Sequence, residues 1–416
     1  MKKVDIKKGT SVLSSYSYAL DANGRIQNIT DQTGAVINSY IYDDAGQLKS
    51  YTDRTGTTEY EYDNVGNRKT KTAPNGTTTY QYNNLNQLTA RFGADGEATY
   101  QYNDKGELTS KDATRFDWNT DGKITKVTRP DYSTVEFKYD AQGRRTEKIV
   151  KNPAGTITRH LQYEYEDATG NLLVETDILA GSKIVYSYSA NGGLISQTQN
   201  GKTYYYNYDG QGNVVSLTDA AGSIVVSYTY DPWGEKVTKT GTIYNPFTYR
   251  GYYQDIETGL YYLLNRYYDP EDGRFLSRDT VEPLNANLYI YVANDPINLA
   301  DPDGTTAKAR YIPKLEINID FRGFGKAIRY GGAAGVFTYI LFGNPTPAGG
   351  DAPNWELINE NYLKKKGIDA HDLKRASLGK KAKIAQYDLY VDKNTKEIYI
   401  FKKGRKGTPI RTGEYL

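Results

Sequence analysis

The first 250 residues of the chain consist of short runs in which aromatic or β-branched residues alternate with polar ones. One such run is Thr77–Tyr82, and turns rich in Asp, Asn and Gly interrupt these runs. Because successive side chains of a strand point to opposite faces, the alternation predicts strands with one buried face. The frequent turns predict that these strands form antiparallel hairpins.

One turn motif repeats with a fixed period. The unit Tyr-Asp/Asn-x-x-Gly-x-Leu/Arg returns every 20 residues between positions 42 and 102. Its glycine supplies a positive φ, and Asn86 replaces that glycine in one copy. The tyrosine is expected to stack on its equivalent in the next hairpin, and the hairpins to join into one curved sheet, because a lone hairpin is unstable in water. The copies begin at Tyr42, Tyr62, Tyr82, Tyr102, Tyr139, Tyr208 and Tyr230.

These repeats resemble the YD-repeat (RHS-repeat) family over roughly residues 16–250. The resemblance implies a mainly β protein, in which a curved antiparallel sheet of stacked hairpins forms a shell around an enclosed polypeptide. The repeat alone also fits a β-solenoid or an adhesin stalk without cargo. The repeats are too few for a large closed chamber, so we expect an open section of wall.

Residues 244–304 end the repeats with a long motif rich in aromatic and acidic residues. Its parts are Tyr249–Asp279, Asn287–Pro296 and Asp301–Gly304. Over its whole length this motif resembles the RHS repeat-associated core domain.

That second resemblance implies an autoprotease of aspartyl type. In such an enzyme one acid accepts a proton from water, while the other, held protonated, donates to the scissile carbonyl. Asp279 and Asp301 match the family's spacing of 22 residues, and Arg278 matches the basic residue beside the first acid. Cleavage is expected shortly after residues 301–304. The first motif departs from the family's Asp-Pro-x-Gly pattern, because Thr, Val and Glu follow its aspartate. The simpler alternative is that both aspartates only cap turns where the shell closes.

The composition supports a strand-rich chain and excludes some kinds of site. Tyrosine is abundant, with 41 residues against 10 Phe and 3 Trp, and cysteine is absent, which excludes disulfides and thiolate metal sites. The residues after Met1–Lys3 are polar, so no N-terminal secretion signal is predicted. Residues 305–416 carry 21 Lys+Arg against 11 Asp+Glu, whereas the rest of the chain carries 31 against 39. A basic tail joined to an acidic body indicates two parts with different partners.

The chain is accordingly divided into four segments. Repeats occupy residues 1–243, the core 244–304, a Gly/Pro-rich linker 305–353, and a basic tail 354–416. The linker contains one apolar run of 13 residues, from Gly331 to Gly343, which is too short to be a stable membrane span. This run either helps the tail across a membrane or packs as a plug inside the shell.

The tail is expected to be a small α+β domain, with Asn354 as the N-cap of its first helix. The predicted elements are helices at 355–364 and 370–378, strands at 384–391, 397–402 and 408–412, and a basic loop at 404–407.

The tail resembles the C-terminal domains of polymorphic toxins, specifically the group called type 33. The resemblance rests on residues 363–371, 378–383 and 409–414. The order of helices and strands also resembles ribonucleases of the barnase and RelE kinds, a likeness of topology that does not establish function.

The tail carries the residue types that cleave RNA without a metal or other cofactor. This reaction needs a base for the 2′-hydroxyl, an acid for the leaving oxygen and cations on the phosphate. His371 is the only histidine of the tail and titrates in the right range, and Thr412 or Glu414 can orient or exchange a proton. The candidate cations are Lys380, Lys381, Lys383, Arg405, Lys406 and Arg411, and the candidate stacking residues are Tyr387, Tyr390 and Tyr399.

Each assignment in the tail has a simpler alternative. A lone histidine also serves as a helix cap, and lysine runs also form a solvated face or balance an acidic partner. No His/Cys cluster with metal-ligand spacing occurs in the sequence, so no metal is expected and a zinc deaminase is excluded.

The sequence therefore favours a secreted or cell-surface toxin of interbacterial competition, whose tail is freed by self-cleavage. The tail is expected to act as a ribonuclease in the target-cell cytoplasm. Expected partners are RNA, an acidic immunity protein and target-cell components. Two alternatives stay open: an adhesive YD-repeat protein with an inert tail, and a toxin that acts on a membrane or another target.

Overall fold

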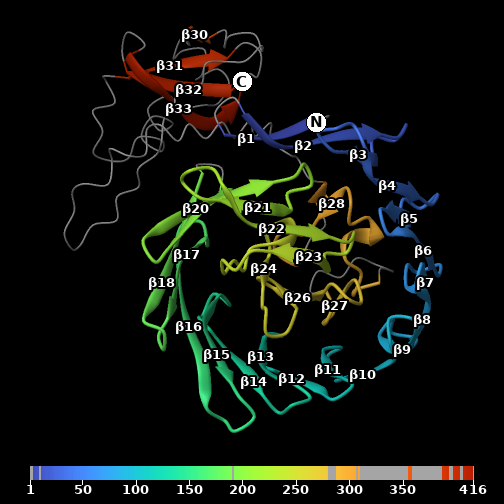
Figure 1. Ribbon diagram of the computed structural model, residues 1–416. Helices are drawn as coiled ribbons and strands as arrows, with labels where there is room; N and C mark the ends of the chain where they lie inside the picture. The colour runs from blue at the N-terminus through green and yellow to red at the C-terminus, as the bar shows by residue number, and fades with distance from the viewer. Residues whose placement is uncertain are drawn as a thin grey trace. The chain divides into compact units, whose positions relative to one another are not determined.

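The computed structural model (Figure 1) divides the chain into two compact units, residues 1–335 and 336–416, which are treated separately below. The structure describes residues 3–8, 11–189, 192–279, 287–305, 308–309, 355–357, 387–392, 397–402 and 406–415.

The first unit contains one antiparallel sheet of 23 strands, in which each strand pairs with its neighbours in sequence. The predicted curved sheet of successive hairpins is confirmed. Its strands are β1 (Lys3–Lys8), β2 (Ser11–Leu20), β3 (Ile26–Thr30), β4 (Val36–Tyr42), β5 (Leu48–Asp53), β6 (Gly56–Tyr62), β7 (Arg68–Ala73), β8 (Gly76–Tyr82), β9 (Leu88–Gly93), β10 (Ala98–Tyr102), β11 (Leu108–Lys111), β12 (Thr114–Trp118), β13 (Ile124–Thr128), β14 (Thr134–Tyr139), β15 (Arg145–Lys151), β16 (Ile157–Tyr165), β17 (Leu172–Asp177), β18 (Ser182–Tyr188), β19 (Leu194–Gln199), β20 (Lys202–Tyr208), β21 (Val214–Thr218), β22 (Ile224–Tyr230) and β23 (Lys236–Thr240).

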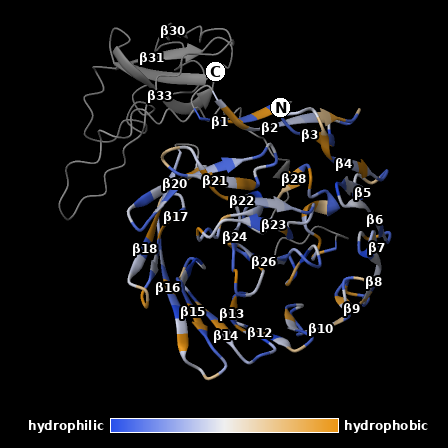
Figure 2. Ribbon diagram, viewed as in Figure 1, coloured by the Kyte–Doolittle hydropathy of each residue, from blue (hydrophilic) through white to orange (hydrophobic). Residues whose placement is uncertain are grey.

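The alternation in the sequence becomes alternation of burial. In β8 the buried residues are Thr78 and Tyr80, and their neighbours along the strand are exposed. Hydrophobic and hydrophilic residues are accordingly interspersed along the strands (Figure 2).

The turn of each repeat is built by its Asp or Asn and its Gly. Asp63 Oδ1 accepts hydrogen bonds from the backbone N–H groups of Val65 and Asn67, at 3.0 and 2.8 Å. Gly66 has φ +81°, and Asn86 takes the same place in the next copy with φ +60°. Asparagine tolerates this left-handed conformation better than most residues do, which explains the replacement.

The repeated tyrosine links hairpins by a hydrogen bond, not by the expected ring stack. The Tyr62 hydroxyl donates to the Leu48 carbonyl at 2.8 Å, and equivalent bonds recur around the sheet. Trp118 stands in the tyrosine position of one copy and donates from its indole nitrogen to the Leu108 carbonyl at 2.7 Å. Equivalent tyrosines lie two strands apart, at roughly 9–10 Å, which exceeds the ~4.5–7 Å of ring stacking.

Replacing Tyr62 by phenylalanine is expected to lower the free energy of unfolding by about 1 kcal/mol, because the Leu48 carbonyl loses its donor. Urea denaturation of the full chain measures this change. Tyr132→Phe is the control, since Tyr132 is 79% exposed. Equal losses in the two variants would contradict a structural role for the repeat hydroxyl.

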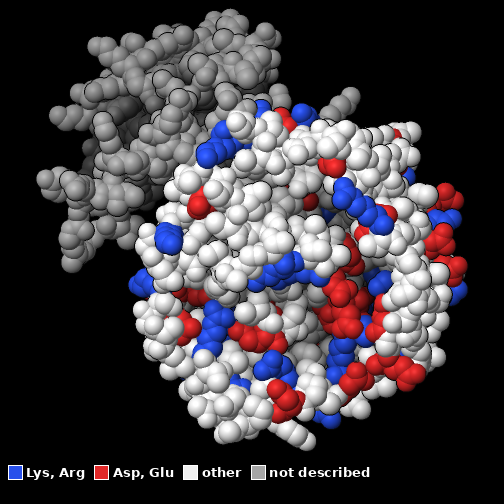
Figure 3. Space-filling model, viewed as in Figure 1, with Lys and Arg blue, Asp and Glu red and all other residues white. Residues whose placement is uncertain are grey.

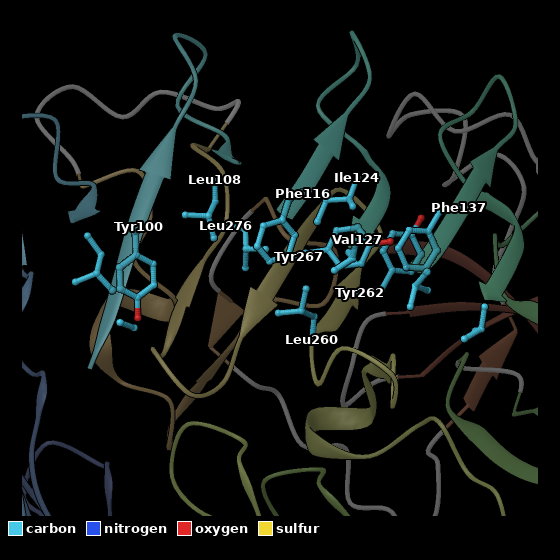
Figure 4. Close-up of a cluster of buried hydrophobic side chains, with 14 of the residues drawn as sticks. Tyr100, Leu108, Phe116, Ile124, Val127, Phe137, Leu260, Tyr262, Tyr267 and Leu276 are labelled. Carbon is cyan, nitrogen blue, oxygen red and sulfur yellow. The ribbon is translucent and has the colours of Figure 1, made fainter. Parts of the chain in front are cut away.

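The sheet curls around residues 244–305 of the same chain (Figure 1). One buried cluster joins sheet residues such as Phe116 and Phe137 to Leu260, Tyr262 and Tyr267 of this core segment (Figure 4). The core segment comprises η1 (Tyr249–Gly251), β24 (Tyr253–Gln254), β25 (Tyr261–Leu263), β26 (Arg266–Asp269), β27 (Arg274–Phe275), η2 (Val292–Asn294) and β28 (Leu299–Ala300), which pairs with β29 (Lys308–Ala309).

Ion pairs between the sheet and the core segment share one polarity, with cations on the sheet and carboxylates on the core. Fully buried Lys148 contacts Asp255 at 3.1 Å and Glu257 at 2.8 Å. The other pairs are Arg145–Asp255, Arg91–Asp272, Arg91–Glu271, Lys111–Asp269, Lys111–Asp272, Lys111–Glu271 and Arg159–Glu257. Acidic and basic side chains lie side by side over the centre of the face in Figure 3.

A turn near the end of the sheet contacts a strand near its beginning. The Gly210 N–H, in the turn before β21, donates to the Tyr18 hydroxyl of β2 at 2.5 Å. Gly210 has no room for a Cβ there, because that atom would lie 2.5 Å from the Tyr18 ring. Within the described sheet, the edge strands β1 and β23 each pair with one neighbour, so the curl ends in two open edges.

The described part of the second unit is a four-stranded antiparallel sheet, in the order β30 (Trp355–Leu357), β31 (Tyr387–Asp392), β32 (Glu397–Lys402) and β33 (Lys406–Tyr415). The strand predicted at 397–402 is confirmed, and β33 is longer than the edge strand predicted at 408–412. The helix predicted from residue 355 is wrong at its start, because residues 355–357 pair with β31. The apolar–polar–apolar sequence of residues 355–357 is compatible with either a helix or a strand, and pairing with β31 makes it a strand. The rest of that helix and the helix at 370–378 lie outside the described residues. Among the described residues, no helix is long and apolar enough to cross a membrane.

Candidate functional site

Three segments of the core bring two aspartates to one arginine. Arg266 begins β26, Asp279 follows β27, and Asp301 follows β28. The Arg266 guanidinium lies 2.8 Å from the Asp279 carboxylate and 3.4 Å from the Asp301 carboxylate. The predicted acids are therefore neighbours in space, joined by a shared cation.

Asp301 is almost fully buried and holds the chain that follows it. Its Oδ1 accepts hydrogen bonds from the backbone N–H groups of Gly304 at 3.0 Å and Thr305 at 3.1 Å. Its own N–H donates to the Tyr252 hydroxyl at 2.9 Å. Asp301 thus caps a turn, as the simpler alternative expected, and the same oxygen contacts the amide nitrogen of Thr305.

Arg266 also binds the backbone of this turn. Its Nε donates to the Gly304 carbonyl, its Nη1 donates to the Leu288 carbonyl at 3.1 Å, and its guanidinium lies 3.6 Å from the centre of the Phe275 ring. Burial lowers the pKa of Arg266, and the charges of Asp279 and Asp301 oppose this shift. The carbonyl carbon of Gly304 is therefore next to a desolvated cation.

Gly304 fits this place because it has no side chain. Its φ is +76°, and a Cβ would lie 2.8 Å from the Leu263 carbonyl oxygen and 3.0 Å from the Arg266 nitrogen. Asn265 holds the preceding residue, since its backbone N–H and its side-chain amide both donate to the Asp303 carbonyl, at 3.1 and 3.0 Å. The turn is fixed on both sides of Gly304.

Sequence reasoning missed Arg266 and chose Arg278. Arg278 is exposed, and its side chain lies beside Gly106 of the sheet. The missed signal was a charged residue at the start of the aromatic strand β26, because a buried cation requires partners. Thr280 and Glu282, where the motif departs from its family, lie outside the described residues.

The structure describes only some of the site residues predicted in the tail. Residues His371, Lys380, Lys381, Lys383 and Arg405 lie outside the described part. Tyr387 lies on β31, and Lys406, Arg411, Thr412 and Glu414 lie on β33.

The register of the tail sheet brings three of the candidate residues into one row. Tyr390 of β31 pairs with Tyr399 of β32, which pairs with Arg411 of β33. Residues directly opposite one another in a sheet share a face. No group of His, Cys, Asp and Glu that could hold a metal ion occurs among the described residues.

A curled sheet of Tyr/Gly hairpins closed over an internal core segment defines the chain as a YD shell. The chain belongs to the teneurin YD-shell family, whose model matches residues 1–297. A second family model, bacterial toxin 33, matches residues 347–416, so a toxin-type domain follows the shell.

The chain is also similar to individual proteins and solved structures. The chain is 39% identical over 202 residues to the tRNA3(Ser)-specific nuclease WapA of Bacillus spizizenii, covering 45% of this chain and 8% of the relative. It is 32% identical over 324 residues to the tRNA(Glu)-specific nuclease WapA of Bacillus subtilis subsp. natto, covering 72% of this chain and 14% of the relative. The solved Photorhabdus luminescens Tc holotoxin pore aligns with a TM-score of 0.41 at 19% identity, covering 74% of this chain and 21% of that chain. The chain thus spans a small fraction of the length of these proteins.

Proposed function

We propose that this chain is part of a secreted bacterial toxin, in which the core segment cuts the chain beside Gly304 and frees the tail as a metal-independent ribonuclease. The shell and the toxin 33 domain support the toxin assignment, and relatives described as tRNA nucleases support RNA as the substrate. The observation that carries the cleavage step is that Arg266 and Asp301 both contact the Gly304–Thr305 peptide, while the same Arg266 pairs with Asp279.

In the proposed cleavage, a water molecule attacks the Gly304 carbonyl carbon. Arg266, already bound to the carbonyl oxygen, stabilises the negative charge that develops there. Asp279 is the base that takes a proton from the water. Asp301 Oδ1 accepts the Thr305 N–H at 3.1 Å before the reaction, so it lies beside the leaving nitrogen, and once protonated Asp301 would give that nitrogen a proton. The C–N bond then breaks, leaving a carboxyl group on Gly304 and a free amine on Thr305. Arg278 would add positive charge from the solvent side.

In the proposed ribonuclease, His371 exchanges protons with the substrate and the basic residues hold the phosphate. Lys381 and Arg411 would stabilise the transition state, and Thr412 or Glu414 would orient or exchange a proton. The row of Tyr390, Tyr399 and Arg411 supports binding of an unpaired base next to a phosphate. Lys380, Lys383, Arg405, Lys406 and Tyr387 would extend this RNA-binding surface.

The charge of the tail also supports an acidic partner. Residues 354–416 carry a net charge of +7, from 15 Lys+Arg and 8 Asp+Glu. A polyanion such as RNA, and an acidic immunity protein that competes with it, both fit this charge. The tail would then act in the cytoplasm of the target cell.

The scissile bond is tested by sequencing the released fragment. The purified chain is expected to yield a fragment that begins with Thr305, and Gly304→Ala is expected to slow its appearance at least about tenfold, because the added Cβ displaces the carbonyl from Arg266. Gly251→Ala is the control, since Gly251 also has a positive φ but a Cβ there meets no atom within 4 Å. A fragment that begins elsewhere would exclude Gly304–Thr305 as the scissile bond.

A further inference from the structure

A small, partly open cavity lies between the repeat sheet and the core segment, away from the aspartate site. It has a volume of about 10 Å³, enough for one particle of the size of a water molecule. Arg68 and Tyr82 of the sheet line it on one side, and Asp272, Arg274 and Asn294 of the core line it on the other.

Two buried guanidinium groups line this cavity without a carboxylate of their own. Arg68 is 6% exposed and Arg274 is 8% exposed. Arg274 Nη2 donates to the Asn86 carbonyl at 2.6 Å, but the Nε atoms of both arginines lack a hydrogen-bond partner. Neither side chain forms an ion pair with any residue that the structure describes. A buried charge in this condition is costly unless something neutralises it.

Aromatic rings neutralise only part of this charge. The Arg68 guanidinium lies 4.1 Å from the centre of the Trp233 ring, and 5.1 and 5.6 Å from the Tyr60 and Tyr80 rings. The Arg274 guanidinium lies 4.9 Å from the Tyr82 ring and 5.3 Å from the Tyr289 ring. An aromatic ring attracts a cation through its quadrupole but carries no net negative charge, so these contacts lower the cost of burial without cancelling the two positive charges.

The carboxylate that lines the cavity is already engaged. Asp272 contacts Arg91 and Lys111, each at 2.9 Å, and both of its oxygens accept from the Tyr100 hydroxyl. The cations of this region outnumber its acids by one: Arg68, Arg91, Lys111 and Arg274 face Asp269, Glu271 and Asp272.

A further acid near the stacked rings does not remove this excess. Asp231 accepts hydrogen bonds from the backbone N–H groups of Trp233 and Glu235. Burial raises the pKa of Asp231 to about 7, so close to neutral pH its carboxyl is partly uncharged.

We infer that this cavity binds a single chloride ion between Arg68 and Arg274. The cavity is too small for phosphate, sulfate or a carboxylate ligand, and a neutral water would leave the excess positive charge in place. Because Arg68 lies on β7 and Arg274 on β27, the ion joins the repeat sheet to the core segment. Chloride binding then stabilises the docked core.

Thermal unfolding of the full chain tests this inference, with sodium chloride replaced by sodium gluconate at constant ionic strength. The Tm is expected to rise with chloride by about 3 °C for each tenfold increase above the dissociation constant. Gluconate is too large for the cavity and is expected to give no rise. Crystals grown in bromide are expected to show an anomalous peak between Arg68 and Arg274.

Arg68→Met keeps the length of the side chain and removes its charge, so its Tm is expected to be independent of chloride. Arg25→Met is the matched control and is expected to keep the dependence, because Arg25 also stacks on a tyrosine, at 4.4 Å, but pairs with Asp21 and lies outside the cavity. Equal Tm values of the wild type in chloride and gluconate, or the absence of a bromide peak, would overturn the proposal even if Arg68→Met failed to fold.

Discussion

Replacing Arg266 by glutamine is expected to leave the 416-residue chain uncut, with a cleavage rate at least about 100-fold below that of the wild type. Glutamine removes the cation that contacts Asp279 and Asp301 and the donor that binds the Gly304 carbonyl. The rate is measured from the loss of the full-length band on a denaturing gel. Asp279→Asn and Asp301→Asn are expected to give the same uncut band, because they remove the proposed base and acid.

Arg278→Gln is the matched control for this experiment. Arg278 is the neighbour of Asp279 in sequence but is exposed, so its loss is expected to have a much smaller effect on the rate. Thermal unfolding of each variant separates lost catalysis from lost folding. Normal cleavage in a folded Arg266→Gln chain would refute the proposed mechanism, and an uncut wild type would refute self-cleavage itself.

Replacing His371 by alanine is expected to reduce RNA cleavage by about 10²–10⁴-fold, the range that a general acid or base contributes. The purified chain is incubated with total bacterial tRNA in the presence of a chelator, and the products are separated on a gel. In living bacteria the wild-type chain is expected to arrest growth with loss of tRNA, and the variant to permit growth.

His160→Ala is the control for the tail, because His160 lies on β16 of the repeat sheet, paired with Glu147 at 3.0 Å. Arg411→Gln, in the row with Tyr390 and Tyr399, is expected to weaken RNA binding.

Potassium leakage without loss of RNA would favour a membrane target over a ribonuclease. Healthy cells that contain the intact soluble chain would favour an adhesive protein with an inert tail.

The repeats were predictable because the residues that determine each turn lie within a single copy of the repeat. Each turn is specified within one copy by its Asp or Asn and its Gly, as in Asp63 and Gly66, and strand alternation follows from burial on one face. The role of the repeated tyrosine was not predictable in the same way. It depends on the distance between equivalent strands, which the period of the sequence does not state.

The candidate site was only half predictable. Asp279 and Asp301 were found through a spacing that the motif preserves, but their shared partner Arg266 comes from a different strand of the core. Contacts of this kind depend on how the core segment folds inside the sheet. The helix predicted at residue 355 failed for a related reason, because a long-range pairing with β31 outweighed the local helical spacing.

The ion pairs between sheet and core fix the number of sheet strands that lie between one anchor on the core and the next. Its carboxylates meet cations on β9, β11, β15 and β16, so each anchor requires a set number of strands between it and the next. Removing one 20-residue repeat would shorten the wall by two strands, or roughly 9–10 Å, and shift every later cation away from its acid. The number of repeats that pass around the core is therefore not free to drift, although the sheet by itself would accept any number of them.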